Sequence, residues 1–391
     1  MDLISAYTPK NRHDYLERIE AAFAVHPVCA LLGPRQCGKT TLSKMYRQKN
    51  KSLAHFFDME NPQDLARLEN PLLALSGLTG LIIIDEIQLR PELFPVLRVL
   101  ADEHADRRFL ILGSASRQLI KQSSESLAGR IQYMELCPFT YPEVDDLERL
   151  WIRGGFPRSY LEKTEASSMQ WREAYVKTYL EQDIPNLGIQ IPAQTLRRFW
   201  MMLSHYHGNL FNASELGRSL GYSDTSIKRY LDLLCGTFMI RQLSPWHENI
   251  SKRQVKAPKV YFRDSGILHT LLKTGDKDAL LSHPKLGASW EGFALETIIR
   301  WHQTEPEDCF FWATHNQAEL DLLLHPHHQR IGFEFKYSDQ PKITKSMHIA
   351  LDDLKLNHLF LIVPFDAKYS LSDKVSVRDL NNYWTEHFLE N

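Results

Sequence analysis

The chain has 391 residues, a formal net charge of -2 and 43% hydrophobic residues, an ordinary composition for a globular protein. This length predicts two to four domains of about 100–200 residues, and the near-neutral charge argues neither for nor against a nucleic-acid partner. The five cysteines are scattered without a CxxC pair, which argues against a disulfide framework or a zinc site and predicts reduced thiols in a cytoplasmic protein.

The chain contains no recognisable export or membrane signal. Its first residues, MDLISAYTPKNRHDYLERIE, are charged and lack the apolar core of a signal peptide. No apolar run approaches the ~18 residues that a membrane-spanning helix needs. We therefore expect a soluble, cytoplasmic protein with no membrane partner.

Short apolar runs alternate with helical patterns in the N-terminal part of the chain. The runs predicted to be strands are Val28–Leu32, 55–58, Leu81–Asp85 and 109–112. Runs of this kind, buried on both faces, favour a parallel sheet covered by helices. The segment 137–142 ends this rhythm, and a mostly helical stretch follows to about residue 240.

The first chemical motif follows the first predicted strand. It reads Gly33-Pro-Arg-Gln-Cys-Gly38-Lys39-Thr40 and matches GxxxxGK[ST] in full. A strand before this loop and a helix from Lys39 after it point backbone N–H groups at phosphate. We predict that Lys39 neutralises the β- and γ-phosphates of ATP and that Thr40 offers its hydroxyl to magnesium. The predicted nucleotide-contacting residues are Gly33, Pro34, Arg35, Gln36, Cys37, Gly38, Lys39, Thr40 and Thr41.

The second motif, Leu81-Ile-Ile-Ile-Asp85-Glu86, is an apolar strand that ends in two carboxylates. Side chains at the carboxyl end of such a strand face the binding crevice of an open sheet. Asp85 suits the magnesium shell, and Glu86 suits a base that polarises the attacking water. The alternative for Glu86 is a capping role at the next helix.

Three more residues belong to this predicted site. Ser114 follows the strand at 109–112 and is predicted to sense the γ-phosphate, with a polar turn as the alternative. Arg130 is predicted either to reach the nucleotide of a neighbouring subunit, which requires a homo-oligomer, or to form a local salt bridge. Cys37 lies inside the phosphate loop, where a small filler side chain is favoured over a redox switch.

Residues 212–235 show the pattern of a helix-turn-helix. The segment 212–221 is a short amphipathic helix ending at glycine, and 225–235 is the next helix, with capping residues in the turn between them. The segments 238–243 and 260–262 are predicted to be the strands of a wing. Together these elements predict a winged helix.

A basic segment lies between the predicted wing strands. Residues 251–259 contain no acidic residue, and two more cations lie on the predicted recognition helix. Such cations can contact DNA phosphates, so we predict a DNA partner. Winged helices also serve as protein–protein modules, which leaves a protein partner as the alternative. The candidate phosphate-contacting residues are Lys228, Arg229, Lys252, Arg253 and Lys256.

The C-terminal part has a third pattern, with a predicted helix at 290–301 and strands at Glu319–Leu324, 331–336 and 358–364. Asp321 lies within a leucine run, and a carboxylate is costly to bury there without a partner such as a metal. Glu334 and Lys336 share one face of the next strand. A hairpin of these strands brings Asp321 near Glu334.

This arrangement is what a magnesium-dependent phosphodiesterase needs. Asp321 and Glu334 are predicted to hold magnesium, Lys336 to orient the attacking water, and Glu291 on the preceding helix to supply a further ligand or base. The alternative is a salt-bridged hairpin without chemistry. The turn residues His325, His327 and His328 are expected to be exposed and not a metal cluster.

The chain resembles, over nearly its whole length, a family of bacterial and archaeal AAA-superfamily ATPases whose C-terminal half is a domain of unknown function. The segments that carry the resemblance are GPRQCGKTTL, LIIIDEIQ, ESLAGR, GGFP, YLEQDIPNLG, APKVYFRDSG, AELDLLL and FEFK. The family often has Thr-Gly-Ser where this chain has Leu112-Gly113-Ser114. The resemblance implies an ATPase domain, a winged helix and a fold like that of the PD-(D/E)xK nucleases.

We therefore predict an α/β multidomain protein that binds and hydrolyses ATP with Mg²⁺ and acts on DNA. The predicted domains are a P-loop AAA-type ATPase domain (1–145), a helical linker (146–205), a winged helix (206–265) and a restriction-endonuclease-like α/β domain (266–391). One rival hypothesis is an ATP-driven switch that recruits protein partners. The other is a DNA-binding ATPase whose nuclease-like fold is inactive.

Overall fold

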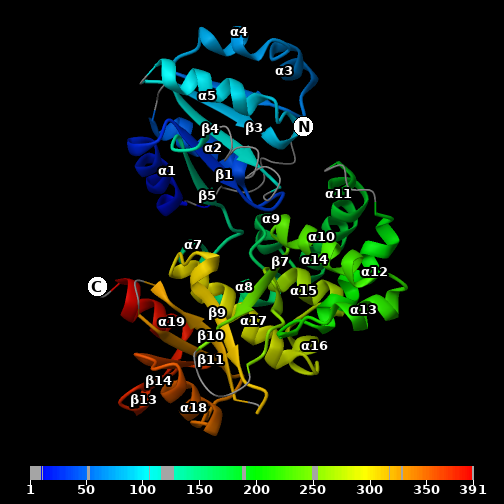
Figure 1. Cartoon of the computed structure of the whole chain (residues 1–391), viewed down its shortest axis with the longest axis vertical. Helices are drawn as coiled ribbons and strands as arrows, with labels where there is room; N and C mark the ends of the chain where they lie inside the picture. The colour runs from blue at the N-terminus through cyan, green and yellow to red at the C-terminus, as the bar shows by residue number, and fades with distance from the viewer. Residues whose placement is uncertain are drawn as a thin grey trace. The chain divides into compact units, whose positions relative to one another are not determined.

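The computed structural model describes residues 10, 12–50, 53–104, 106–115, 127–186, 191–248, 254–316, 318–326 and 329–389. The predicted basic residues Lys252 and Arg253, and the turn residues His327 and His328, lie outside this part of the chain. The chain divides into two compact units (Figure 1). Unit 1 comprises Met1–Asp146, Phe156–Leu161 and Gly236–Met239, and unit 2 comprises Leu147–Gly155, Glu162–Cys235 and Ile240–Asn391.

Unit 1 contains a parallel five-stranded sheet in the order β2-β3-β4-β1-β5. Its strands are β1 (Val28–Leu32), β2 (Ala54–Asp58), β3 (Leu81–Asp85), β4 (Arg108–Gly113) and β5 (Ile131–Glu135). The prediction of the first four strands was correct to within one residue at each end. It missed β5, because this edge strand is only partly buried and mixes polar with apolar residues.

Helices cover both faces of this sheet (Figure 1). On one face, Cys29 and Leu31 pack with α1 and α2, and on the other face their neighbours Val28 and Ala30 pack with α5. Because every residue of β1 is buried, the strand reads as a continuous apolar run. The helices of unit 1 are α1 (His13–Val25), α2 (Lys39–Asn50), α3 (Pro62–Arg67), α4 (Pro71–Ser76), the 3₁₀ turn η2 (Ile87–Leu89), α5 (Leu93–Glu103), α7 (Tyr141–Val144) and α9 (Pro157–Leu161).

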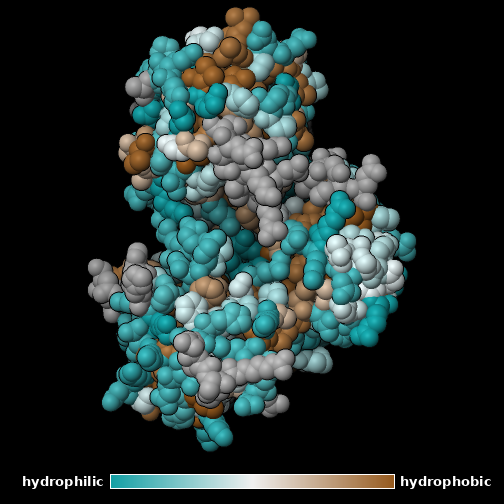
Figure 2. All heavy atoms as spheres, in the orientation of Figure 1, coloured by the Kyte–Doolittle hydropathy of each residue, from teal (hydrophilic) through white to brown (hydrophobic). Residues whose placement is uncertain are grey.

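Helix α4 carries exposed apolar side chains. Leu72 and Leu73 are 46% and 74% exposed, and brown spheres gather over this helix in Figure 2. Isolated apolar residues are normal on protein surfaces, so this pair does not by itself mark a binding site.

Unit 2 is built on a mixed nine-stranded sheet in the order β13-β14-β12-β11-β10-β9-β7-β8-β6. Ser244 and Pro245 of β7 pair in parallel with β9, so the predicted wing strands continue into the C-terminal sheet. The predicted boundary at residue 265 falls inside this unit. The strands are β6 (Asn209–Leu210), β7 (Ile240–Pro245), β8 (Lys259–Phe262), β9 (Cys309–Ala313), β10 (Glu319–Leu324), β11 (Ile331–Phe335), β12 (His358–Val363), β13 (Lys368–Ser372) and β14 (Val375–Asp379).

Helices account for the remaining regular structure of unit 2 in the described part of the chain. None of the helices that the structure describes has the length and apolar composition needed to cross a lipid bilayer. They are α8 (Leu147–Arg153), α10 (Glu165–Thr178), η3 (Tyr179–Asp183), α11 (Ile184–Asn186), α12 (Ala193–His205), α13 (Ala213–Leu220), α14 (Asp224–Gly236), α15 (Ser265–Leu272), α16 (Lys277–Leu281), α17 (Leu286–Trp301), η4 (Pro306–Asp308), α18 (Lys345–Asp353), α19 (Leu380–Trp384) and η6 (Thr385–Leu389).

The two helices α13 and α14 begin and end close to where their caps predict. The Asn212 side chain accepts a hydrogen bond of 3.2 Å from the Glu215 N–H, and Gly221 ends α13 in the left-handed conformation. The Ser223 hydroxyl accepts a bond of 3.2 Å from the Ser226 N–H at the start of α14. The antiparallel strands β6, β8 and β7 follow, in that spatial order.

A close contact between two distant segments explains why both are rich in glycine. Asp264 caps α15 through a bond of 2.9 Å from the Ile267 N–H, and its other oxygen accepts a bond of 2.8 Å from the Gly155 N–H. Gly154 lies directly against this carboxylate, with a φ of +74°, and a Cβ there would come within 2.1 Å of it. The segments 154–157 (GGFP) and 263–266 (RDSG) therefore pack against each other.

Candidate functional site

The loop between β1 and α2 folds closely around the Lys39 side chain. Lys39 donates hydrogen bonds of 2.9 Å to the carbonyl oxygens of Gly33 and Pro34. Gly33 lies against the chain after β5, where a Cβ would come within 2.2 Å of the Leu136 carbonyl oxygen. A side chain at residue 33 would therefore displace the loop.

The side chains of Thr40 and Asp85 meet, as expected of two residues that share one magnesium ion. The Thr40 hydroxyl donates a hydrogen bond of 2.6 Å to the Asp85 carboxylate. Burial raises the pKa of Asp85, and the bond from Thr40 opposes this rise. These two residues are separated by 45 positions along the chain, and the β1–β4–β3 strand order brings them together. Hard oxygen donors of this kind fit Mg²⁺.

Glu86 is held by side chains from two directions. Its carboxylate accepts a bond of 2.9 Å from the Ser114 hydroxyl, and a second from the Gln88 amide. Gln88 also donates a bond of 2.9 Å to the Ser114 oxygen. Glu86 has a φ of 51° and makes no side-chain capping bond to η2, so the capping alternative is not observed. Sequence reasoning missed Gln88, because no spacing pattern marks it.

Arg12 was also missed, because nothing in its local sequence distinguishes it. Its guanidinium donates to the Cys37 carbonyl at 3.2 Å and to the Cys137 carbonyl at 2.8 Å, and it forms an ion pair with Glu143. Arg12 is buried, and it links the phosphate loop to the segment after β5. The Cys37 thiol is fully buried and burial raises its pKa, which fits the filler role better than a redox switch.

Arg130 lies away from these residues. It precedes β5 and its carbonyl accepts a bond from the Val28 N–H, which places it at the amino edge of the sheet, opposite the phosphate loop. Its guanidinium forms two hydrogen bonds, of 2.6 and 2.7 Å, with Asp102. The predicted salt bridge is therefore present. The alternative role, at a neighbouring subunit's nucleotide, remains a prediction.

The C-terminal residues Asp321, Glu334 and Lys336 also lie together. The β10–β11 register pairs Leu322 with Phe333, so Asp321 and Glu334 follow as the next opposed pair. Lys336 Nζ lies 2.9 Å from Glu334 Oε2 and 3.7 Å from Asp321 Oδ2. Both carboxylates are buried. The hairpin predicted from the sequence is therefore present.

Lys259, the last residue of the basic segment 251–259, lies in the same cluster. This residue is only 5% exposed, because its side chain lies on the face of β8 that is covered by the carboxylates of the cluster. Its Nζ lies 3.6 Å from Glu291 Oε1 and 3.7 Å from Asp321 Oδ1, and it forms an ion pair with Glu319. The Tyr261 hydroxyl donates a bond of 2.6 Å to Glu291 Oε1. Glu291 therefore faces a lysine and a tyrosine.

Burial dominates the electrostatics of this cluster. Burial first, and the charge of Asp321 second, raise the pKa of Glu291 to about 7 and that of Glu334 to about 8. Burial alone would lower the pKa of Lys259, but the groups around it, beginning with Tyr261 and Glu291, raise this pKa well above its ordinary value. The groups around Lys259 therefore favour its charged form.

The metal-binding capacity of this cluster is limited. Within the described ranges, no group of three or more His, Cys, Asp or Glu residues is arranged to hold a metal ion. Asp321 and Glu334 carry carboxylate oxygens, the donor type that magnesium prefers, and Lys336 is paired with both of them. His325, which was expected to be exposed, is half-buried, and its ring lies 5.3 Å from the ring of Trp246 in a tilted contact.

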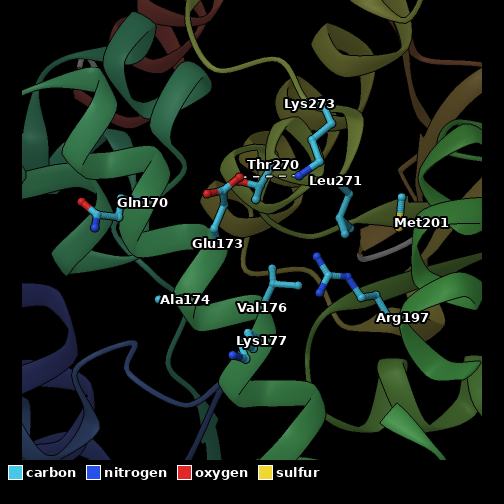
Figure 3. A pocket seen from close by; sticks show the side chains of 10 residues that line it. All are labelled: Gln170, Glu173, Ala174, Val176, Lys177, Arg197, Met201, Thr270, Leu271 and Lys273. Atoms are coloured by element: carbon cyan, nitrogen blue, oxygen red, sulfur yellow. Dashed lines mark ion pairs between the residues drawn. The ribbon is translucent and has the colours of Figure 1, made fainter. Parts of the chain in front are cut away.

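A separate pocket lies among α10, α12 and α15 and contains none of the predicted site residues (Figure 3). Its volume is about 370 Å³. Lys273 pairs with Glu173 at 3.5 Å, and the lining also includes the cations Lys177 and Arg197 and the apolar residue Val176. This lining suits a ligand that combines an apolar group with a negative charge.

Three family models match the chain in sequence. Residues 25–145 match an AAA domain, residues 144–278 match a domain of unknown function (DUF8612), and residues 286–383 match another (DUF4143). A solved structure, the Walker-type ATPase PABY2304 of Pyrococcus abyssi, is 15% identical and covers 68% of this chain and 96% of that chain with a TM-score of 0.48. A TM-score below 0.5 gives this likeness no weight for function.

Two relatives match almost the whole chain. They are Uncharacterized protein Rv2008c of Mycobacterium tuberculosis and Uncharacterized protein Mb2031c of Mycobacterium bovis. Each is 48% identical over 367 residues, which cover 93% of this chain and 82% of the relative. The chain therefore belongs to the family of these two mycobacterial proteins, and its residues 25–145 are an AAA domain with the parallel α/β fold of a P-loop ATPase.

Proposed function

We propose that unit 1 binds ATP with Mg²⁺ and hydrolyses it. The observation that carries this proposal is the 2.6 Å bond between Thr40 and Asp85, beside a Glu86 carboxylate that Ser114 and Gln88 orient. Glycine-loop N–H groups and the start of α2 supply the phosphate site. These groups come from the ends of β1, β3 and β4, which meet at one edge of the sheet.

Each of these residues has a distinct role in hydrolysis. Lys39 exchanges its bonds to the loop carbonyls for bonds to the phosphate oxygens, and Thr40 and Asp85 would hold the magnesium ion. The ion, when bound, neutralises charge on the phosphates. Glu86 orients the attacking water and accepts its proton, since its carboxylate already lies beside Ser114 at the phosphate edge.

Nucleotide binding and phosphate release by the purified chain test this proposal. Lys39→Ala is expected to lose tight ATP binding, because a charge-assisted contact to phosphate disappears. Lys44→Ala is a suitable control in α2, because it also removes a lysine and the Lys44 side chain is exposed outside the predicted nucleotide-contacting residues. Wild-type affinity in Lys39→Ala would contradict the assignment of the phosphate loop.

We further propose that unit 2 binds DNA through a winged helix formed by residues 206–265. Helices α13 and α14 and the antiparallel strands β6, β8 and β7 support this interpretation. Lys228 and Arg229 lie on the exposed side of α14, while Ile227 and Tyr230 are buried, so the cationic face is available to phosphates.

The same proposal assigns DNA cleavage to the carboxylate cluster. Asp321 and Glu334 would hold one divalent cation, which supplies charge stabilisation for the scissile phosphate. Lys336 lies 2.9 Å from Glu334 and is 42% exposed, so it can orient a water from the solvent side. This geometry resembles that of a nuclease site in its two opposed carboxylates and adjacent lysine.

Cleavage of a panel of DNA structures with and without Mg²⁺ or Mn²⁺ tests the nuclease proposal. Asp321→Ala, Glu334→Ala and Lys336→Ala are each expected to abolish cleavage. Metal affinity should fall in the first two variants and stay near wild type in Lys336→Ala, because Lys336 is not a ligand. Lower melting temperatures with unchanged metal binding in all three variants would indicate a structural cluster.

A second candidate function is an ATP-driven switch that recruits protein partners. The observation that favours it is the presence of two lysines inside the carboxylate cluster, because Lys259 and Lys336 already neutralise part of its charge. An active ATPase that retains no DNA at low salt and cuts none would support this alternative.

A further inference from the structure

The two oxygens of Asp321 face different cations. Oδ1 lies 3.7 Å from Lys259 Nζ, whereas Oδ2 lies 3.7 Å from Lys336 Nζ and accepts a bond of 3.1 Å from the Phe335 N–H. The carboxylate cluster therefore has two halves that share Asp321. One half contains Glu334 and Lys336, and the other contains Glu291, Glu319 and Lys259.

The Lys259 half is built around a fixed cation. Lys259 is the first residue of β8, and its Nζ lies 5.6 Å from the centre of the Phe311 ring on β9. Tyr261, two residues along β8 and fully buried, donates its bond to Glu291 from the same strand face. These contacts come from four elements, β8, β9, β10 and α17, so the ammonium has one well-defined position.

We propose that Lys259 is a built-in cation that takes the place of a metal ion between Glu291, Glu319 and Asp321. This leaves only the Asp321–Glu334 half for a divalent cation. A buried lysine within 4 Å of several carboxylate oxygens occupies the space and supplies the charge that a second ion would bring. Glu291 accordingly pairs with Lys259 and accepts a hydrogen bond from Tyr261, and it does not bind metal.

The net charge of the carboxylate cluster is consistent with the binding of one divalent cation. Its four carboxylates, Glu291, Glu319, Asp321 and Glu334, and its two ammonium groups, on Lys259 and Lys336, give a net charge of -2 in the fully ionised state that a bound divalent cation favours. One divalent cation neutralises this charge. On the proposed function, cleavage then follows single-metal chemistry, in contrast to sites that hold two metals about 3.5–4 Å apart.

Counting bound Mn²⁺ tests this inference. The loss of the free Mn²⁺ electron paramagnetic resonance signal measures the number of ions that the full-length, nucleotide-free chain binds. Wild type is compared with Lys259→Met and Lys259→Arg. All three share the same ATP site, so any Mn²⁺ bound there cancels in the difference. Asp321→Ala gives the number of ions bound outside the cluster.

Lys259→Met is expected to bind one Mn²⁺ more than wild type, because three carboxylates lose their internal cation. Its melting temperature should also rise on addition of Mn²⁺ more than that of wild type, because the extra ion binds only the folded chain. Lys259→Arg keeps the charge and should show neither change. A folded Lys259→Met without the additional ion would overturn the inference.

Glu291→Gln keeps the test decisive even if Lys259→Met does not fold. It should bind as many Mn²⁺ ions as wild type, because Glu291 contacts Lys259 and Tyr261. Loss of a bound ion in Glu291→Gln would overturn the assignment of Lys259. Equal Mn²⁺ counts in wild type and Asp321→Ala would instead refute the metal site of the proposed nuclease, which is a separate result.

Discussion

Ser114 donates a hydrogen bond of 2.9 Å to the Glu86 carboxylate, and so joins the end of β4 to the end of β3. Gln88 contacts both residues and closes a small polar cluster. Glu86 has left-handed backbone torsions, which cost energy for a residue with a side chain. A carboxylate held in this way is oriented before the nucleotide arrives.

Glu86→Gln is expected to bind ATP with near-normal affinity and to hydrolyse it about 10²–10⁴-fold more slowly, because an amide cannot take a proton from water. Single-turnover phosphate release and titration with a fluorescent ATP analogue separate hydrolysis from binding. Ser114→Ala and Gln88→Ala should show smaller losses, because they only orient the base. Wild-type turnover in Glu86→Gln would show that the base is another group.

Arg130→Ala distinguishes a residue acting across subunits from a surface ion pair. If Arg130 reaches a neighbouring nucleotide, the variant keeps ATP affinity and loses hydrolysis, and mixing it with Lys39→Ala restores some activity at hybrid interfaces. Asp102→Ala is the matched control, because it removes the same ion pair and leaves the arginine in place. Equal, small effects of the two changes, with a monomeric mass in ATP, would leave Arg130 as a surface salt bridge.

DNA affinity is expected to depend steeply on salt. Neutralising Lys252, Arg253 and Lys256 together should lower the slope of log K against log salt by about 2–3, since each phosphate contact contributes about 0.7–0.9. Fluorescence anisotropy between low and moderate salt measures this slope. Lys44→Gln, an exposed lysine on α2, serves as the control and should leave the slope unchanged. An unchanged slope in the triple variant would place the DNA contact elsewhere.

The stability of the chain is expected to fall as pH rises from about 5 to 8 in the presence of a metal chelator. Burial raises the pKa of Glu334 to about 8, so the folded state holds a proton there that the unfolded state releases above its ordinary pKa. Each tenfold difference in proton affinity corresponds to about 1.4 kcal/mol. Glu334→Gln should flatten this dependence. Thermal melts at several pH values measure it, and an equally steep fall in the variant would assign the effect to other groups.

Much of the ATP site can be read from the sequence because its determinants are local. The phosphate loop needs a strand, a glycine-rich turn and a helix in direct succession, and Val28–Leu32, Gly33 to Gly38 and the helix from Lys39 supply them within one short segment. Likewise, the apolar run Leu81–Asp85 predicts a buried strand whose last carboxylate faces the site. The pairing of Asp321 with Glu334 follows from a hairpin, which is also a local structure.

The remaining features depend on contacts between segments far apart in the chain. Arg12 meets Cys137 across 125 positions, and Lys259 meets Asp321 because β7 pairs with both β8 and β9. The local sequence around Lys259, a basic segment without acidic residues, does not indicate which groups its ammonium contacts. Only the tertiary structure surrounds this ammonium with carboxylates, whose attraction offsets the cost of burying the charge.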